Sequence, residues 1–240
     1  MYVSAIVLAA GQGLRFKSKV PKPLLKINSK PIIIHCLETF SRHSFIKDII
    51  LVVNPLNKKG IISSIKQYRI KKIRDIALGG KERQDSVFNA LKAIDVKTDL
   101  VLIHDGVRPF IDKELVSLVI KEARNCGAAI VGVPVKATIK QVTSISDNRR
   151  PKTDRRSCVV VQTLNRENLW EIQTPQVFRK EFILKAYEEF GNTEVTDDAM
   201  LVEKLGVEVR AVRGSYDNIK ITTAEDLVIA EAIARLAHSS

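Results

Sequence analysis

The segment "LAAGQGLRF" near the N-terminus ends an apolar run in two glycines and places an arginine two positions further on. Gly11 and Gly13 allow backbone N–H groups to approach an anion closely, because no side chain stands in the way. Arg15 and Lys22, which follows seven residues later, would place two positive charges on the same phosphate chain. Phe16 takes the place of the third glycine of a dinucleotide-binding turn, which argues against a nicotinamide or flavin site. The spacing therefore favours a loop that binds phosphates.

A carboxylate and two basic residues follow other apolar runs of the chain. Asp105 ends the run "DLVLIHD", where a carboxylate can meet Mg²⁺ or a ribose hydroxyl without being buried unpaired. A turn cap is the alternative for Asp105, because Gly106 follows it. Arg108 is near enough in sequence to pair with Asp105 or to face a second anionic group. Lys220 alternates with two isoleucines in "DNIKI", which predicts that it projects from the opposite face of an extended segment; a solvated surface lysine is the alternative.

Apolar runs that alternate with amphipathic segments indicate how these loops are positioned. Five runs are nearly continuous in Val, Ile and Leu, as is typical of strands buried on both faces. They lie at residues 4–10, 48–53, 99–105, 128–135 and 207–213. Segments with helical periodicity and capping signals lie at residues 30–43, 81–94, 112–127 and 222–238. This alternation predicts an α/β fold with a doubly wound, mainly parallel, Rossmann-like sheet, whose loops gather ligands outside the carboxyl ends of the strands.

One stretch, residues 141–165, breaks the alternation of strands and helices. Two β-prone pieces flank a charged, proline-containing tip that offers no helix. We expect a protruding β-arm that packs against a second subunit, because its exposed backbone edges would be costly to leave unpaired. A mobile surface loop is the alternative, since a tip this basic is also well solvated.

Length, charge and composition narrow the class of protein. A chain of 240 residues is large enough for one α/β domain with a substantial core. The net charge of +12, from 39 Lys and Arg against 27 Asp and Glu, favours polyanionic partners, but 5% aromatic residues give little support to base stacking on nucleic acid. The three cysteines are scattered and predict neither a disulfide framework nor a zinc site. No apolar stretch could span a bilayer and no leader pattern is evident, so we expect a cytoplasmic protein.

Seven segments occur in the order found in one enzyme family: "LAAGQGLRF", "PKPLLKINSKPIIIH", "GGKERQDSV", "HDGVRPF", "TPQVF", "TDDA" and "DNIKIT". Over essentially its whole length the chain resembles the 2-C-methyl-D-erythritol 4-phosphate cytidylyltransferases of the non-mevalonate isoprenoid pathway. The resemblance implies transfer of CMP from CTP to the sugar phosphate with release of pyrophosphate, Mg²⁺ as cofactor, and a fold of the nucleotidyltransferase type. It also implies one cytidylyltransferase domain over residues 1–240, which forms a homodimer through an arm at about 141–165.

The resemblance assigns roles to residues that match the family's motifs. It implies that the catalytic cations are Arg15, Lys22 and Lys220. It implies that the nucleotide contacts Ala9, Ala10, Gly11, Gly13, Gly80, Ser86 and Asp105, with Asp105 also on the metal side and Gly80 and Ser86 at the cytosine edge. It implies that the sugar phosphate contacts Arg108, Thr174 and Thr196, together with Thr138 and Arg166 from the partner's arm. The chain departs from the family at Pro23, where many relatives carry glutamine, and at Asn165, where aspartate is frequent.

Three other functions are compatible with parts of this pattern. A ribitol 5-phosphate cytidylyltransferase has similar nucleotide segments and an acceptor that differs in a few hydroxyls and a methyl group. A sugar-1-phosphate nucleotidyltransferase is more distant, and the short chain and the "DNIK" segment count against it. A non-catalytic nucleic-acid-binding module would explain the basic surface but not the ordered glycine, carboxylate and lysine segments. We therefore expect CTP and a sugar or polyol phosphate as ligands, with no nucleic acid and no membrane as partners.

Overall fold

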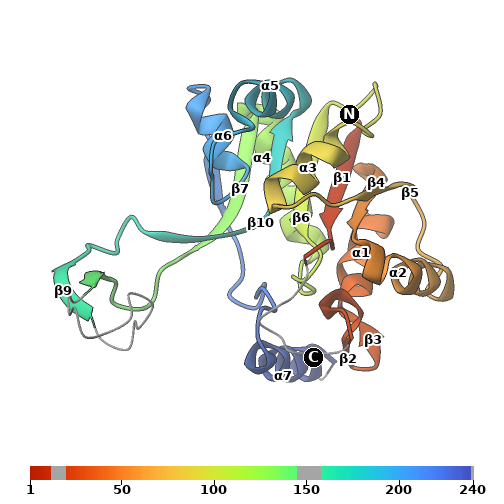
Figure 1. The fold of residues 1–240 in the computed structure, drawn as a ribbon, viewed down its shortest axis with the longest axis horizontal. Coiled ribbons are helices and arrows are strands. Elements are labelled where there is room, and N and C mark those ends of the chain that lie inside the picture. Colours follow the sequence, from red (N-terminus) through yellow and green to blue (C-terminus); the bar gives the residue numbers. More distant parts are fainter. Residues whose placement is uncertain (12–19, 145–157, 239–240) are drawn as a thin grey trace.

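The computed structural model describes residues 1–11, 20–144 and 158–238, and its centre is a seven-stranded sheet (Figure 1). The strand order is β11-β7-β10-β6-β1-β4-β5. The strands are β1 (Val3–Leu8), β4 (Ile46–Val53), β5 (Ile73–Leu78), β6 (Leu100–Asp105), β7 (Ala128–Pro134), β10 (Trp170–Arg179) and β11 (Arg210–Arg213). β10 runs antiparallel to both of its neighbours, whereas the other pairs are parallel. The expected mainly parallel sheet is therefore confirmed, with one reversed strand inside it.

Helices cover both faces of the sheet, as expected for a doubly wound fold. They are α1 (Ile32–Arg42), α2 (Pro55–Gln67), α3 (Arg83–Leu91), α4 (Lys113–Cys126), α5 (Lys180–Phe190) and α6 (Ala199–Lys204), whereas α7 (Ala224–His238) packs in a separate cluster with Ile27 and Ile221. Phe40 of α1 and Val116 of α4 share a buried cluster with Val7 of β1, while α3, α5 and α6 share another with Ile6. Adjacent residues of β1 thus face opposite layers, and each such buried side chain contributes about 1.5–3 kcal/mol.

Local signals explain where individual elements begin and end. The side chain of Asp112 accepts a hydrogen bond from the backbone N–H of Leu115 (2.6 Å) at the start of α4. Gly127 ends this helix with φ 96°, and a side chain there would collide with Phe182. β11 differs from expectation: the sequence predicts a strand buried on both faces, but only Val212 is buried, because β11 forms the edge of the sheet.

A small layer joins the C-terminal helix to the N-terminal half of the chain (Figure 1). Lys22–Leu24 form a 3-10 helix, followed by the two-residue strands β2 (Lys26–Ile27) and β3 (Lys30–Pro31). Ile27 of β2 packs with Ile221 and with Ala230 of α7, and the backbone N–H of Ile221 donates to the carbonyl of Val107 (3.0 Å). These contacts anchor the segment that carries Lys220 beside the loop after β6.

The predicted β-arm is present and projects away from the sheet (Figure 1). β8 (Lys140–Ser144) and β9 (Cys158–Thr163) pair antiparallel as a separate two-stranded sheet, reached from β7 and returning into β10. Three consecutive valines, Val159, Val160 and Val161, are each more than half exposed. The tip, residues 145–157, lies outside the described residues.

No helix in the described part of the chain is long and apolar enough to cross a membrane.

Candidate active site

Asp105, the last residue of β6, is the centre of a cluster of positive side chains. Lys220 Nζ lies 2.7 Å from Asp105 Oδ2, and Arg83 Nε lies 3.3 Å from Oδ1. Arg108 Nε is 4.0 Å from Oδ2. Burial opposes ionisation of Asp105, but the charges of Arg83 and Lys220 outweigh it and hold the pKa of this carboxyl well below its usual range. Asp105 therefore remains a carboxylate across the physiological pH range, and its side chain faces cations rather than capping a turn.

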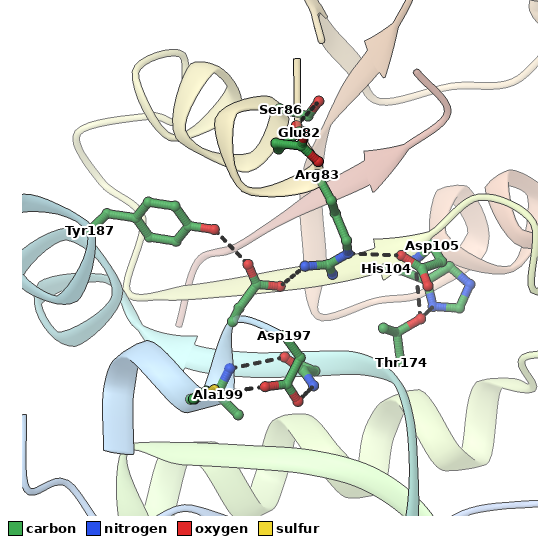
Figure 2. A network of polar contacts seen from close by, with 12 residues as sticks. Glu82, Arg83, Ser86, His104, Asp105, Thr174, Tyr187, Asp197 and Ala199 are labelled. Atoms are coloured by element: carbon green, nitrogen blue, oxygen red, sulfur yellow. Dashed lines mark hydrogen bonds and ion pairs between the residues drawn. The ribbon is translucent and has the colours of Figure 1, made fainter. Parts of the chain in front are cut away.

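A chain of neutral hydrogen bonds fixes the backbone of Asp105. Its N–H donates to Thr174 Oγ1 (3.0 Å), and Thr174 Oγ1 lies 3.1 Å from His104 Nδ1. His104 Nε2 faces the carbonyl of Arg108 (3.1 Å), so Nε2 carries the hydrogen and Nδ1 accepts from the threonine hydroxyl. Burial lowers the pKa of His104 to about 4, which keeps the ring neutral at pH 7. Figure 2 shows His104 and Thr174 beside Asp105.

The neutral state of His104 predicts acid sensitivity of the fold. A folded pKa below the unfolded value contributes stability that is fully present above pH ~6.5 and is lost as pH falls toward about 4. The wild type should therefore lose about 2 kcal/mol more unfolding free energy between pH 7 and pH 4.5 than His104→Gln does. Urea denaturation at both pH values measures the difference, and parallel losses in the two proteins would contradict it.

Arg108 connects Asp105 to the loop that carries Lys220. Its guanidinium is buried, and Nη1 donates to the carbonyl of Asn218 (2.7 Å). Asn218 is itself fully buried and donates through Nδ2 to the Gln173 side chain (3.1 Å) and the Thr174 carbonyl (3.0 Å). Arg108 Nε has no hydrogen-bond partner among the described residues. The site thus holds a buried cationic group with donor capacity to spare.

The segment after β1 is held by two asparagines at the start of α2. Asn57 Nδ2 donates to the carbonyl of Ala9 (2.7 Å), and Asn54 Nδ2 donates to the carbonyl of Ala10 (2.9 Å). The oxygens of the same two amides form the capping box of α2. Among the described residues, a Cβ on Gly11 would meet no atom within 4 Å. The backbone that leads into the glycine segment is therefore held in place at Ala9 and Ala10.

The glycine segment after β5 lies directly against the segment after β1. A Cβ on Gly79 would stand 2.3 Å from the Cβ of Ala10, so only glycine permits this approach. The N–H of Gly80 donates to Ser86 Oγ (3.1 Å), and the Ser86 hydroxyl donates to the carbonyl of Glu82 (3.1 Å). Gly80 and Ser86 are thus bonded to each other at the start of α3. Ala10 and Gly80, which the sequence predicts as nucleotide contacts from two separate segments, therefore lie in the same region of the structure.

Arg83 bridges two buried carboxylates. Its Nη1 lies 2.8 Å from Asp198 Oδ2, and the Tyr187 hydroxyl donates to Asp198 Oδ1 (2.6 Å). Burial disfavours the charged form of Arg83, but the charges of Asp198 and Asp105 outweigh it and raise its pKa. Burial together with the Asp198 charge raises the pKa of Tyr187, so its hydroxyl stays protonated and donates. Figure 2 shows Arg83 reaching from α3 toward Asp105, with Tyr187 on the other side.

Comparison with known proteins shows the family of the chain. Residues 3–236 match the family model described as "IspD: 2-C-methyl-D-erythritol 4-phosphate cytidylyltransferase". The chain belongs to this family. A member from Alkaliphilus metalliredigens is 43% identical over 234 residues, covering 96% of this chain and 92% of that one. The chloroplastic enzyme of Oryza sativa is 42% identical over 96% of this chain and 74% of its own length.

Solved structures of cytidylyltransferases share the fold. The 4-diphosphocytidyl-2C-methyl-D-erythritol synthase from Anaerococcus prevotii superimposes with a TM-score of 0.82 at 36% identity, covering 98% of this chain and 96% of that one. The 2-C-methyl-D-erythritol 4-phosphate cytidylyltransferase from Thermus thermophilus gives 0.74 at 29% identity. The match over nearly the whole chain does not favour the ribitol phosphate or nucleic-acid-binding alternatives.

The residues expected at the cytidylyltransferase phosphates are only partly described. Gly13 and Arg15 lie outside the described residues. Lys22 is the first residue of the 3-10 helix Lys22–Leu24 and is partly buried. Pro23, where many relatives carry glutamine, is buried in the same turn.

The residues expected at the sugar phosphate fall into two groups. Arg108 and Thr174 lie at the Asp105 cluster, whereas Thr196 is exposed in the turn before α6. Thr138 and Arg166 belong to the arm segments before β8 and after β9, where Arg166 Nη1 donates to a backbone carbonyl. The segments that join β7 to β8 and β9 to β10, which carry these two residues, extend away from the sheet (Figure 1).

Several residues of the site carried no role in the sequence prediction. Arg83 and Asp198 lie within the matching segments "GGKERQDSV" and "TDDA", so the segments themselves were the available signal. His104 directly precedes Asp105, and Asn218 begins "NIK". Tyr187, in the middle of α5, has no local signal that distinguishes it from a core tyrosine.

Proposed function

We propose that this enzyme transfers CMP from CTP to 2-C-methyl-D-erythritol 4-phosphate, giving 4-diphosphocytidyl-2-C-methyl-D-erythritol and pyrophosphate. The observation that carries the proposal is the cluster of Lys220, Arg83 and Arg108 around Asp105, at the carboxyl end of a strand paired with β1. In a sheet of this type ligands bind at that edge. The cluster supplies fixed positive charge where a phosphate chain would lie along the segment after β1.

The reaction needs positioning and electrostatic stabilisation rather than a covalent enzyme intermediate. The acceptor phosphate attacks the α-phosphorus of CTP in line, and negative charge accumulates on the equatorial oxygens. Lys220 is 40% exposed, so its ammonium group can exchange Asp105 for a phosphate oxygen. Arg83 and Arg108 are less exposed and remain beside Asp105. Lys22 and Arg15 supply the other charges at the phosphates in this proposal.

Mg²⁺ is the proposed cofactor, and Asp105 is the residue that would hold it. Mg²⁺ is usually bound through one or two carboxylates together with substrate phosphates, not by a complete protein cage. Among residues 1–11, 20–144 and 158–238 no group of three or more His, Cys, Asp or Glu side chains is arranged for a metal, which fits binding through one carboxylate and the nucleotide. When bound, the cation would neutralise charge on the triphosphate.

The cytoplasmic location expected from the sequence stays a prediction.

A homodimer is proposed as the working unit, in which the arm of one chain completes the site of the other. The support is the exposed apolar strand β9 with Val159, Val160 and Val161, and the position of Arg166 and Thr138 on the arm. An exposed strand edge presents unpaired N–H and C=O groups with which another chain can pair.

The shared site predicts complementation between two inactive variants. In a heterodimer of Arg166→Ala with Lys220→Ala, purified through two different tags, one of the two sites regains both residues. It should show about half of the wild-type activity per dimer. The matched control pairs the double variant Arg166→Ala/Lys220→Ala with the wild-type chain, and there both sites lack one residue. An active control with an inactive test heterodimer would show that each arm serves its own chain.

The proposed reaction is tested by pyrophosphate release from CTP and Mg²⁺ with 2-C-methyl-D-erythritol 4-phosphate and ribitol 5-phosphate in parallel. Turnover with the branched methyl sugar alone is the expected result. Turnover with ribitol phosphate alone would assign the enzyme to polyol activation, and no turnover with either would reject the proposal.

A further inference from the structure

Two buried side chains beside the site, Asp198 and Tyr187, take no part in the chemistry proposed above. Asp198 is 1% exposed and Tyr187 is 4% exposed, and they come from different elements, the start of α6 and the middle of α5. Both converge on Arg83, which is the first residue of α3. Three helices thus contribute one side chain each to a single polar contact chain that ends at Asp105 (Figure 2).

The contacts define the orientation of the Arg83 side chain. The hydrogen bond from Nε to Asp105 Oδ1 (3.3 Å) holds only one edge of the guanidinium. The 2.8 Å contact between Nη1 and Asp198 fixes that end, so the planar group is held on two sides. Tyr187 fixes Asp198 in turn through its 2.6 Å hydrogen bond, and the Tyr187 ring stacks on Phe88 of α3 (6.1 Å between centroids, planes 15° apart).

Burying a carboxylate is costly, and an apolar side chain of similar volume would stabilise a core at least as well. The Asp198 carboxylate is buried and forms an ion pair with Arg83, which itself reaches the site. A buried carboxylate in this position is therefore explained by what it does to Arg83 rather than by packing. Arg83 in turn supplies the charge that stays on Asp105 when Lys220 moves to a phosphate.

We propose that Asp198 and Tyr187 are positioning residues for nucleotide binding, which hold the Arg83 guanidinium beside Asp105. The proposal rests on the proposed function, because it assigns the effect to the CTP side of that reaction. Arg83 follows the segment of Gly79 and Gly80, which lies against Ala10, whereas Lys220 and Arg108 lie at the other oxygen of Asp105. Loss of the contact chain should therefore weaken CTP binding and leave binding of the sugar phosphate unchanged.

The test compares Asp198→Asn with Asp197→Asn in the full-length enzyme. Asp197 is the matched control: it is the preceding residue, and it binds Gln176 Nε2 (2.8 Å) and the N–H of Met200 (3.1 Å) rather than Arg83. Asp198→Asn should raise KM for CTP about tenfold with KM for 2-C-methyl-D-erythritol 4-phosphate within about twofold of wild type. Asp197→Asn should leave both KM values within about twofold.

Two further measurements keep the proposal falsifiable. Tyr187→Phe removes one hydroxyl and should raise KM for CTP about threefold. This variant tests the same contact chain if Asp198→Asn does not fold. In an Arg83→Gln background, Asp198→Asn should add less than about twofold, because the effect passes through Arg83.

Three results would overturn the proposal. The first is an unchanged KM for CTP in Asp198→Asn. The second is an equal rise of the KM values for CTP and for the sugar phosphate that Asp197→Asn also shows. The third is a rise in KM for CTP from Asp198→Asn that is as large in the Arg83→Gln background as in the wild type. Calorimetric titration of CTP reports the same loss of affinity without turnover. The titration therefore tests this proposal independently of the proposed reaction. Failure of the proposed reaction would instead appear as a lack of pyrophosphate release by the wild type.

Discussion

Lys220→Ala should lower kcat about a hundredfold or more, which corresponds to about 2.7 kcal/mol or more of lost transition-state stabilisation. Lys220 Nζ lies 2.7 Å from Asp105, and the extended segment that carries it is anchored by the buried Ile221. The backbone of Lys220 is therefore fixed before substrate arrives, and only its side chain moves from Asp105 to a phosphate oxygen. Such preorganisation is the condition under which a charged group stabilises a transition state strongly. Single-turnover kinetics with saturating CTP measure the chemical step directly.

Two comparisons make the Lys220 result interpretable. Lys220→Arg keeps the charge and should retain more activity than the alanine variant, although the longer planar group changes the contact with Asp105. Lys185→Ala on the exposed face of α5 removes an equal charge far from Asp105 in sequence and should leave kcat unchanged. If Lys220→Ala turned over like the wild type, Lys220 would be a surface lysine without a catalytic role.

The second large effect is expected for Lys22→Ala, again about a hundredfold or more in kcat with the fold intact. Lys22 begins a short 3-10 helix between Pro21 and Pro23, whose rings restrict the backbone on both sides. This turn packs against α1 and α2, the helix whose first asparagines hold Ala9 and Ala10. The local structure thus presents Lys22 from a stiff element that packs on the helix holding Ala9 and Ala10.

Lys26→Ala is the matched control for Lys22, because Lys26 is exposed on β2 four residues further along. Its kcat should equal that of the wild type, and thermal unfolding should show both variants folded. Near-wild-type turnover by Lys22→Ala would remove Lys22 from the catalytic residues.

The main features of the fold were predictable because the signals are local. The buried strands β1, β4, β6 and β7 appear as continuous apolar runs, and α4 carries both an aspartate cap and a terminal glycine. β10 was not among the expected strands. Its first three residues are exposed or half-buried, and its buried part begins with the polar residues Gln173 and Thr174, so no uniform periodicity indicates it.

The site was predictable to the extent that its residues end strands or follow them. Asp105 and Lys220 were placed correctly at one edge because parallel strands bring their following loops together. The contact of Arg83 with Asp198 joins residues more than a hundred positions apart and depends on how α5 and α6 pack beside α3. No local pattern encodes that packing, so the partners of Arg83 became visible only in three dimensions.

Asn54 and Asn57 illustrate how two demands can constrain one side chain over evolutionary time. Each uses its amide oxygen to cap α2 and its amide nitrogen to hold the carbonyl of Ala9 or Ala10. Aspartate or serine at either position could still cap the helix but could not supply both groups with the same reach. A substitution that is neutral at an ordinary helix start would therefore release the backbone of Ala9 or Ala10 here. Selection on that backbone should thus restrict both positions to asparagine.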